Sequence, residues 1–193
     1  MNTIVINKSN PGKVPEGLAI FSGSFNPFHH GHLTIANVAS KILGKLIQLE
    51  ISRQNTDKPE IDYMEFYERE DQIHTKCRSA ECIENLYVTD APLFLEKAKI
   101  FSKAVFIIGA DTLLGIEDSK NWTIQPNMNM ICSEFRIGGN RFLVVQRKGI
   151  DISYVNKTLL GLCDVVPVEI YEDDGVSSTQ IRKTFKLAPK KFL

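Results

Sequence analysis

Residues 23–33 read GSFNPFHHGHL and lie between an apolar run at 17–21 and an apolar pattern typical of a helix. A strand that ends at a glycine and continues as a helix directs backbone N–H groups and the positive end of the helix dipole toward one point. His29 and His32 are three residues apart, so they share a face if the first helical turn begins near His29. Because imidazole N–H groups can donate to phosphate oxygens, the stretch predicts chemistry on phosphate groups.

The turn residues of this stretch suit a ligand that approaches the backbone. Gly23 can adopt the angles of a sharp exit from a strand, and it has no side chain to block a phosphate. Pro27 fixes the turn and drives the residue before it toward an extended conformation. The alternative is an ordinary turn with two surface histidines. Three of the four histidines of the chain fall within residues 29–32, which favours the phosphate site.

The same stretch resembles the first motif of the HxGH nucleotidylyltransferases, in which a strand leads into a glycine-rich turn and H-x-G-H. The resemblance covers residues 23–32, with Asn26 where the family more often has Asp. Residues 177–182, SSTQIR, are similar to the family's second signature, S-[ST]-T-x-[IL]-R. Members include nicotinamide and nicotinate mononucleotide adenylyltransferases, phosphopantetheine adenylyltransferases and glycerol phosphate cytidylyltransferases. VFIIGADTL at 105–113 and RFLVVQRKG at 141–149 resemble the central strand of the family and the strand that follows it.

Strands and helices alternate along the chain, and this alternation predicts a parallel sheet with helices on both faces. The expected fold class is α/β, a Rossmann-like doubly wound sheet in a single domain at 17–193, after an irregular N-terminal leader at 1–16 with a short strand at 4–6. Further strands are expected at 17–21, 45–51, 86–89, 105–109, 142–146 and 165–170, and helices at 30–43, 63–85, 92–101 and 178–187. Ligands of such a sheet bind at the carboxyl ends of the strands.

The resemblance implies direct nucleotidyl transfer, in which a phosphate of the acceptor attacks the α-phosphorus of ATP and pyrophosphate leaves. It assigns His29 and His32 to the α- and β-phosphates, and Arg182 with Thr179 to the β- and γ-phosphates. Ser178, or the serine before it, would cap the last helix so that its first N–H groups face a phosphate. By itself this C-terminal segment favours a capped surface helix with an exposed arginine. Together with the histidine motif it favours phosphate binding, because one triphosphate needs donors from several directions.

Further substrate-binding residues are expected along the same edge of the sheet. The backbone at Gly23, Ser24 and Phe25 would contact the phosphate of the acceptor. Asp111 follows Gly109 at the end of the most apolar strand, where its carboxylate can accept from a ribose hydroxyl or a base amino group, or cap the next helix. No carboxylate cage for a resident metal is evident. Mg²⁺ is therefore expected to arrive with the nucleoside triphosphate, held mostly by phosphate and water.

The acceptor is inferred from two less specific segments. Trp122, the only tryptophan, follows G-x-D at a distance similar to that of a tryptophan that stacks on the nicotinamide ring in mononucleotide adenylyltransferases, although a core or rim aromatic explains it equally well. Residues 49–66 carry E-[IL]-S-x-x-N-x-D-K-P, a pattern of a less characterised branch, in which Lys58 is either a phosphate contact or a solvated lysine. The preferred acceptor is nicotinamide or nicotinate mononucleotide. The alternatives are adenylyl or cytidylyl transfer to another phosphorylated acceptor, and a nucleotide-binding regulator without turnover.

Composition narrows the class of protein. Lys and Arg number 23, as do Asp and Glu, so no bulk charge indicates nucleic acid or a membrane surface as a partner. His74, Cys77 and Cys82 are close in sequence, but they lie in a charged, helix-like stretch, and no zinc site is expected. We see no secretion signal and no apolar stretch of transmembrane length. The sequence therefore predicts a cytoplasmic enzyme with reduced thiols, and leaves homo-oligomer formation open.

Overall fold

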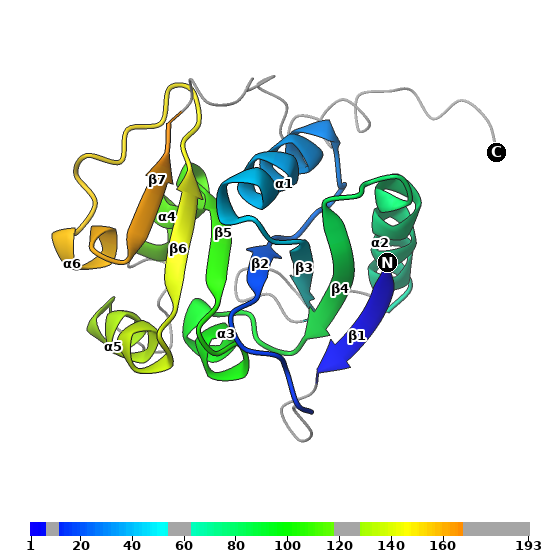
Figure 1. Cartoon of the computed structure of the whole chain (residues 1–193), viewed down its shortest axis with the longest axis horizontal. Coiled ribbons are helices and arrows are strands. Elements are labelled where there is room, and N and C mark those ends of the chain that lie inside the picture. The colour runs from blue at the N-terminus through cyan, green and yellow to red at the C-terminus, as the bar shows by residue number, and fades with distance from the viewer. Residues whose placement is uncertain (7–11, 54–62, 118–127, 168–193) are drawn as a thin grey trace.

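In the part of the chain that the structure describes, seven strands form one sheet in the order β1-β4-β3-β2-β5-β6-β7 (Figure 1). The computed structural model describes residues 1–6, 12–53, 63–117 and 128–167. Every strand pair in the sheet is parallel. The strands are β1 (Asn2–Ile6), β2 (Ala19–Ser22), β3 (Ile47–Ser52), β4 (Ile83–Thr89), β5 (Val105–Gly109), β6 (Arg141–Val145) and β7 (Cys163–Val166).

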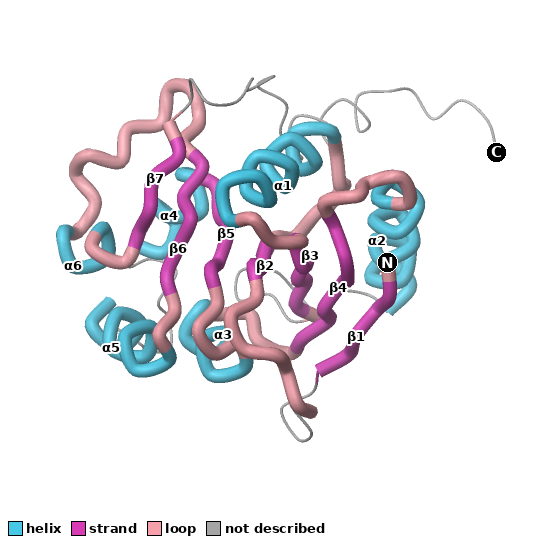
Figure 2. Tube along the Cα trace, in the orientation of Figure 1, coloured by secondary structure: helices cyan, strands magenta, loops and turns pink. Residues whose placement is uncertain are grey.

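Helices cover both faces of this sheet (Figure 2). One face packs against α1 (His30–Leu43) and α2 (Tyr63–Cys77). The other packs against α3 (Phe94–Ile100), α4 (Ala110–Glu117), α5 (Met128–Gly138) and α6 (Lys157–Leu160). The expected Rossmann-like α/β fold is confirmed. None of the helices that the structure describes is long and apolar enough to cross a membrane.

The central strand β5 shows why the chain folds in this way. Phe106 and Ile108 face the core that includes α5, whereas Val105 and Ile107 face the core that includes α1, and all four are buried. A continuous apolar strand is therefore stable only between two layers of helices. The predicted bounds of this strand, 105–109, agree with those of β5.

The order of the strands reverses beside β5. β2 pairs with β3 on one side and with β5 on the other, so consecutive strands are added outward in two directions. At this position the connection that follows β2 leads to α1 on one face of the sheet, and the connection that follows β5 leads to α4 on the opposite face. Such a switch point is where open α/β sheets bind ligands.

The N-terminal segment differs from the expected irregular leader. β1 occupies Asn2–Ile6 and pairs with β4 over its whole length, from Asn2 opposite Asn85 to Ile6 opposite Thr89. The short strand expected at 4–6 exists and is two residues longer than expected. Residues 2–6 belong to the sheet rather than to an irregular leader. Five residues without clear alternation give little sequence signal, and the open edge of β4 decides their conformation.

The helix expected at 63–85 also ends early. α2 stops at Cys77, and β4 begins at Ile83 rather than at residue 86. Residues 83–85 pair with β3, where Ile47 is opposite Ile83, so hydrogen-bonding partners in the sheet override a locally helical pattern. The helices α5 and α6 were not predicted. The helix expected at 178–187 lies outside the described residues.

Candidate active site

The two histidines of the first motif lie at the start of α1, directly after β2. His29 occupies the N-cap position in an extended conformation, and α1 begins at His30. The ring centroids of His29 and His32 are 3.8 Å apart. The prediction that they share one face of the first turn is confirmed. Both imidazoles therefore lie where the free N–H groups and the dipole of α1 favour an anion.

The protonation of His32 is fixed by its surroundings. Burial, and after it the neighbouring His29 and Arg147, lower the pKa of His32 to about 3. The backbone N–H of His29 donates to Nδ1 of His32 over 3.1 Å. Because Nδ1 is an acceptor in this bond, the ring proton lies on Nε2. At neutral pH His32 is therefore an uncharged imidazole that can donate through Nε2–H, rather than a cation.

Aromatic packing holds the His32 ring in place. Its centroid lies 5.0 Å from that of Phe25 and 5.2 Å from that of Phe28, and the latter ring is stacked on it. Phe25 and Phe28 are both fully buried, with exposed fractions of 1% and 0%. Such contacts restrict the rotation of the imidazole, which is what a donor that must meet a defined phosphate oxygen requires.

Gly23 and Phe25 form the tight turn between β2 and α1. Phe25 has a φ of 43°, a conformation that side-chain-bearing residues rarely adopt. A Cβ atom added to Gly23 would lie 2.8 Å from Cε1 of Phe25. Gly23 is thus required by the packing of Phe25. Ser24, between them, is exposed, consistent with the expected place of these residues beside a substrate.

A contact from α2 supports the same turn from outside. The Asn26 side chain donates to Oε1 of Glu65 over 3.2 Å, and the Arg69 guanidinium lies 3.3 Å from the same oxygen. Glu65 therefore connects the turn between β2 and α1 to helix α2, although the two segments are far apart in sequence.

The carboxyl ends of β5 and β6 supply a second group of polar residues. Asp111 lies in the first turn of α4, and its Oδ1 occupies the space next to Gly109 where a Cβ would stand. The Cδ atom of Arg147 would lie 3.9 Å from that same Cβ position. Since the charge of Arg147 also acts on His32, Arg147 lies near both the Asp111 carboxylate and the histidine pair.

The structure thus brings together part of the predicted site. His29, His32, Gly23, Ser24 and Phe25 lie at the end of β2, and Gly109 and Asp111 at the end of the adjacent β5. Lys58, Trp122, Ser178, Thr179 and Arg182 lie outside the described residues.

Arg147 is a site residue that the sequence reasoning missed. It lies two residues after the end of β6, in a segment that was recognised only as a strand. Its position after a buried strand next to β5, at the ligand-binding edge of the sheet, was the available signal.

No set of three or more His, Cys, Asp or Glu side chains in the described ranges lies close enough together to hold a metal ion. The donors around His32 are N–H groups, which suit phosphate oxygens rather than a cation.

Comparisons with known proteins agree with this geometry. The sequence model of the family described as Cytidylyltransferase-like matches residues 20–184. The "Probable nicotinate-nucleotide adenylyltransferase" of Endomicrobium trichonymphae is 25% identical over 198 residues, which cover 90% of this chain and 88% of the relative. Among solved structures, this chain is similar to Plasmodium falciparum nicotinic acid mononucleotide adenylyltransferase, in its complexes with NaAD (15% identity) and with APC (16% identity). Each comparison has a TM-score of 0.57 and covers 88% of this chain and 83% of the Plasmodium chain.

Proposed function

We propose that this chain, which belongs to the cytidylyltransferase-like family, transfers the adenylyl group of ATP to nicotinate mononucleotide and releases pyrophosphate, a reaction of NAD biosynthesis. The observation that carries the proposal is the His29–His32 pair at the N-terminus of α1, beside the switch point of the sheet. The relative from Endomicrobium and the Plasmodium structures support nicotinate mononucleotide as the acceptor. Nicotinamide mononucleotide is the alternative acceptor.

The reaction needs no nucleophile from the protein. An oxygen of the acceptor phosphate attacks the α-phosphorus of ATP, the bond from that phosphorus to the β-phosphate oxygen breaks, and pyrophosphate leaves with the electron pair. The work of the site is to align the two substrates and to stabilise charge on the phosphate oxygens. His32 Nε2–H is a fixed neutral donor for this purpose.

Other residues complete the proposed site from both sides. Arg147 adds positive charge beside His32, and Asp111 offers a carboxylate for a ribose hydroxyl or a base amino group. From the family resemblance of the sequence, we assign Arg182 and Thr179 to the β- and γ-phosphates and Ser178 to the cap of the last helix. Mg²⁺ bound to the triphosphate would neutralise part of its charge, and the chain's own contribution there is the set of N–H donors.

Trp122 is a proposed contact of the pyridine ring of the acceptor, and Lys58 is a proposed further contact to a phosphate. A cytoplasmic location belongs to the same proposal, because all four cysteines are free thiols and such thiols persist in reducing compartments.

A pyrophosphate-release assay tests the proposal. ATP and CTP would each be combined with nicotinate mononucleotide, nicotinamide mononucleotide, phosphopantetheine and glycerol 3-phosphate. We expect the fastest release from ATP with nicotinate mononucleotide. Release with CTP only would replace ATP as the nucleotidyl donor, and release with one of the last two acceptors only would replace the acceptor assignment. Either result would keep nucleotidyl transfer. Binding of ATP without release in any combination would indicate a nucleotide-binding regulator and refute the proposed activity.

A further inference from the structure

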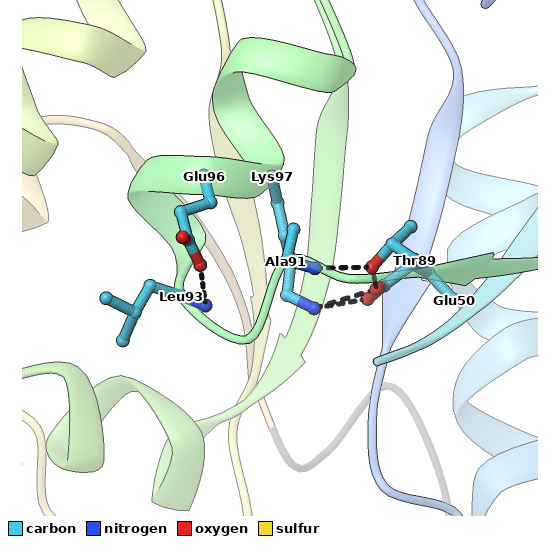
Figure 3. A network of polar contacts seen from close by, with 6 residues as sticks. All are labelled: Glu50, Thr89, Ala91, Leu93, Glu96 and Lys97. Carbon is cyan, nitrogen blue, oxygen red and sulfur yellow. Dashed lines mark hydrogen bonds and ion pairs between the residues drawn. The ribbon is translucent and has the colours of Figure 1, made fainter. Parts of the chain in front are cut away.

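A buried ion pair lies between the sheet and α3, on the face opposite the one that α1 covers. Glu50, on β3, is 0% exposed, and its carboxylate oxygens lie 2.8 and 2.6 Å from Nζ of Lys97 on α3 (Figure 3). The Thr89 hydroxyl donates to the same carboxylate over 2.6 Å, and the backbone N–H of Ala91 donates to the Thr89 hydroxyl over 3.2 Å. One carboxylate therefore joins β3, the end of β4, the turn after it and α3.

Stability by itself is a weak explanation of this pair. Removing two charges from water costs free energy that their attraction often fails to recover, and apolar replacements of a buried pair are frequently neutral or stabilising. A better explanation is that the pair fixes a geometry. The Glu50 carboxylate accepts three hydrogen bonds from two different elements, which ties this residue of β3 to β4 and to α3.

The backbone of Glu50 connects this network to the histidine loop. Its carbonyl accepts the N–H of Gly23 over 3.1 Å, and Ser22 is its partner in the register of β2 and β3. This bond continues the ladder one residue beyond the end of β2 and sets the direction in which the chain leaves the sheet. Glu50 therefore contacts the first residue of the phosphate-binding turn.

Packing extends the connection from Gly23 to His32. The position of Gly23 is coupled to the Phe25 ring, because a Cβ at residue 23 would stand only 2.8 Å from that ring. The Phe25 ring in turn meets the His32 imidazole edge to face, with centroids 5.0 Å apart. A shift of the Glu50 carbonyl would therefore be passed through two tightly packed contacts to the donor of the site.

We propose that Glu50 is a positioning residue of the active site: Lys97 and Thr89 fix its carboxylate, so that its carbonyl holds Gly23 and, through Phe25, the His32 imidazole. The proposal rests on the proposed function, since it assigns His32 to a phosphate. It predicts that the network controls the rate of the chemical step more than the affinity for substrates. A displacement of about 1 Å at such a site can lower a rate by about 10²-fold.

The test uses Glu50→Gln, Lys97→Met and the double variant. Gln can still accept from Thr89, and the double variant buries no uncompensated charge, so it should regain most of the thermal stability that the single variants lose. We expect kcat of the double variant to stay about 10- to 100-fold below that of the wild type, with KM for ATP changed less than about threefold. All rates are measured at a temperature at which circular dichroism shows each variant folded.

A matched control is the exposed ion pair of Glu16 and Lys103, which has the same 2.6 Å separation and lies before β5. Glu16→Gln should leave kcat unchanged. If the double variant regains both stability and wild-type kcat, the network serves stability only and the proposal is overturned.

A readout that needs no turnover separates this proposal from the proposed function. Nitrogen-15 spectra of the imidazoles report the tautomer and titration of His32. In the double variant the His32 signals should move from their wild-type positions and titrate closer to the ordinary histidine range, whereas Glu16→Gln should leave them in place. If the wild type releases no pyrophosphate, the proposed activity fails, but the spectra still test the positioning role of Glu50. Unchanged His32 signals in the double variant would overturn that role.

Discussion

Replacement of His32 by alanine should abolish most of the activity without unfolding the protein. The imidazole is a neutral donor, because its Nδ1 accepts from the backbone N–H of His29 and its pKa is lowered to about 3. His32→Ala removes the Nε2–H donor and leaves the phosphate oxygen that it would meet without a partner in the transition state.

The expected magnitude follows from the loss of one fixed donor. Such a loss lowers kcat by about 10²-fold or more, which corresponds to about 2.7 kcal/mol of transition-state stabilisation. The ring also packs on Phe25 and Phe28, with centroids at 5.0 and 5.2 Å. If each contact contributes as an aromatic pair does, the free energy of unfolding falls by about 1–3 kcal/mol. The loss of rate is therefore larger than a small unfolded fraction could explain.

The assay is pyrophosphate release at saturating ATP and acceptor, at a temperature at which the variant is folded by circular dichroism. His30→Ala is the matched control, because His30 belongs to the same motif but its side chain is exposed. Wild-type kcat in a folded His32→Ala variant would refute the role of the imidazole. An equal loss in His30→Ala would show that the rate reports on the helix start rather than on the donor.

Four further predictions concern the same site. The folded protein lowers the pKa of His32 from its ordinary value of 6.5 to about 3, so the unfolded state binds more protons between these two pH values. The free energy of unfolding should therefore fall as the pH is lowered through this range. Denaturant titrations of the wild type should show this slope, and those of His32→Ala should show a smaller one. Gly23→Ala should cost about 1–3 kcal/mol of stability and lower kcat, because the added Cβ would press on the Phe25 ring at 2.8 Å; unchanged thermal unfolding would contradict the tight packing. Arg182→Lys should weaken the binding of a non-hydrolysable ATP analogue, because a lysine cannot reproduce a bidentate guanidinium. If the Lys and Ala variants both bind the analogue with wild-type affinity, Arg182 does not belong to the site. Nicotinate mononucleotide should quench the fluorescence of Trp122, the only tryptophan of the chain, and Trp122→Ala should raise the KM of the acceptor more than that of ATP; a protein that binds ATP but shows no quench would exclude the stacking.

The fold was largely predictable because its strongest signals are local. The apolar run of β5 indicated its bounds correctly, and the strand, glycine turn and helix around residues 23–33 placed α1 to the residue. Elements whose conformation depends on a partner strand were less predictable. β1 is stabilised by pairing with β4, about eighty residues later in the chain, and the start of β4 is stabilised by pairing with β3. No window of the sequence contains both partners.

The candidate site was predictable where a single motif contains all its parts. His29 and His32 share one helical turn, so their spacing in the sequence fixes their spacing in space. Arg147 was missed because its proximity to His32 depends on the lateral order of β2, β5 and β6 rather than on any local pattern. Glu50 was missed for the same reason: its partners Thr89 and Lys97 come from the next strand and from the following helix.

The sequence by itself determined the class of fold, the glycine turn before α1 and the pair of imidazoles at its start, because each follows from the conformational preferences and periodicity of neighbouring residues. Only the tertiary structure decided how the imidazoles are used. Burial among Phe25 and Phe28 and the nearby charge of Arg147 keep His32 uncharged, and the bond from the His29 backbone selects its tautomer. Desolvation and charge proximity depend on distances between segments that are remote in the chain, and those distances arise only when the sheet and its helices have packed.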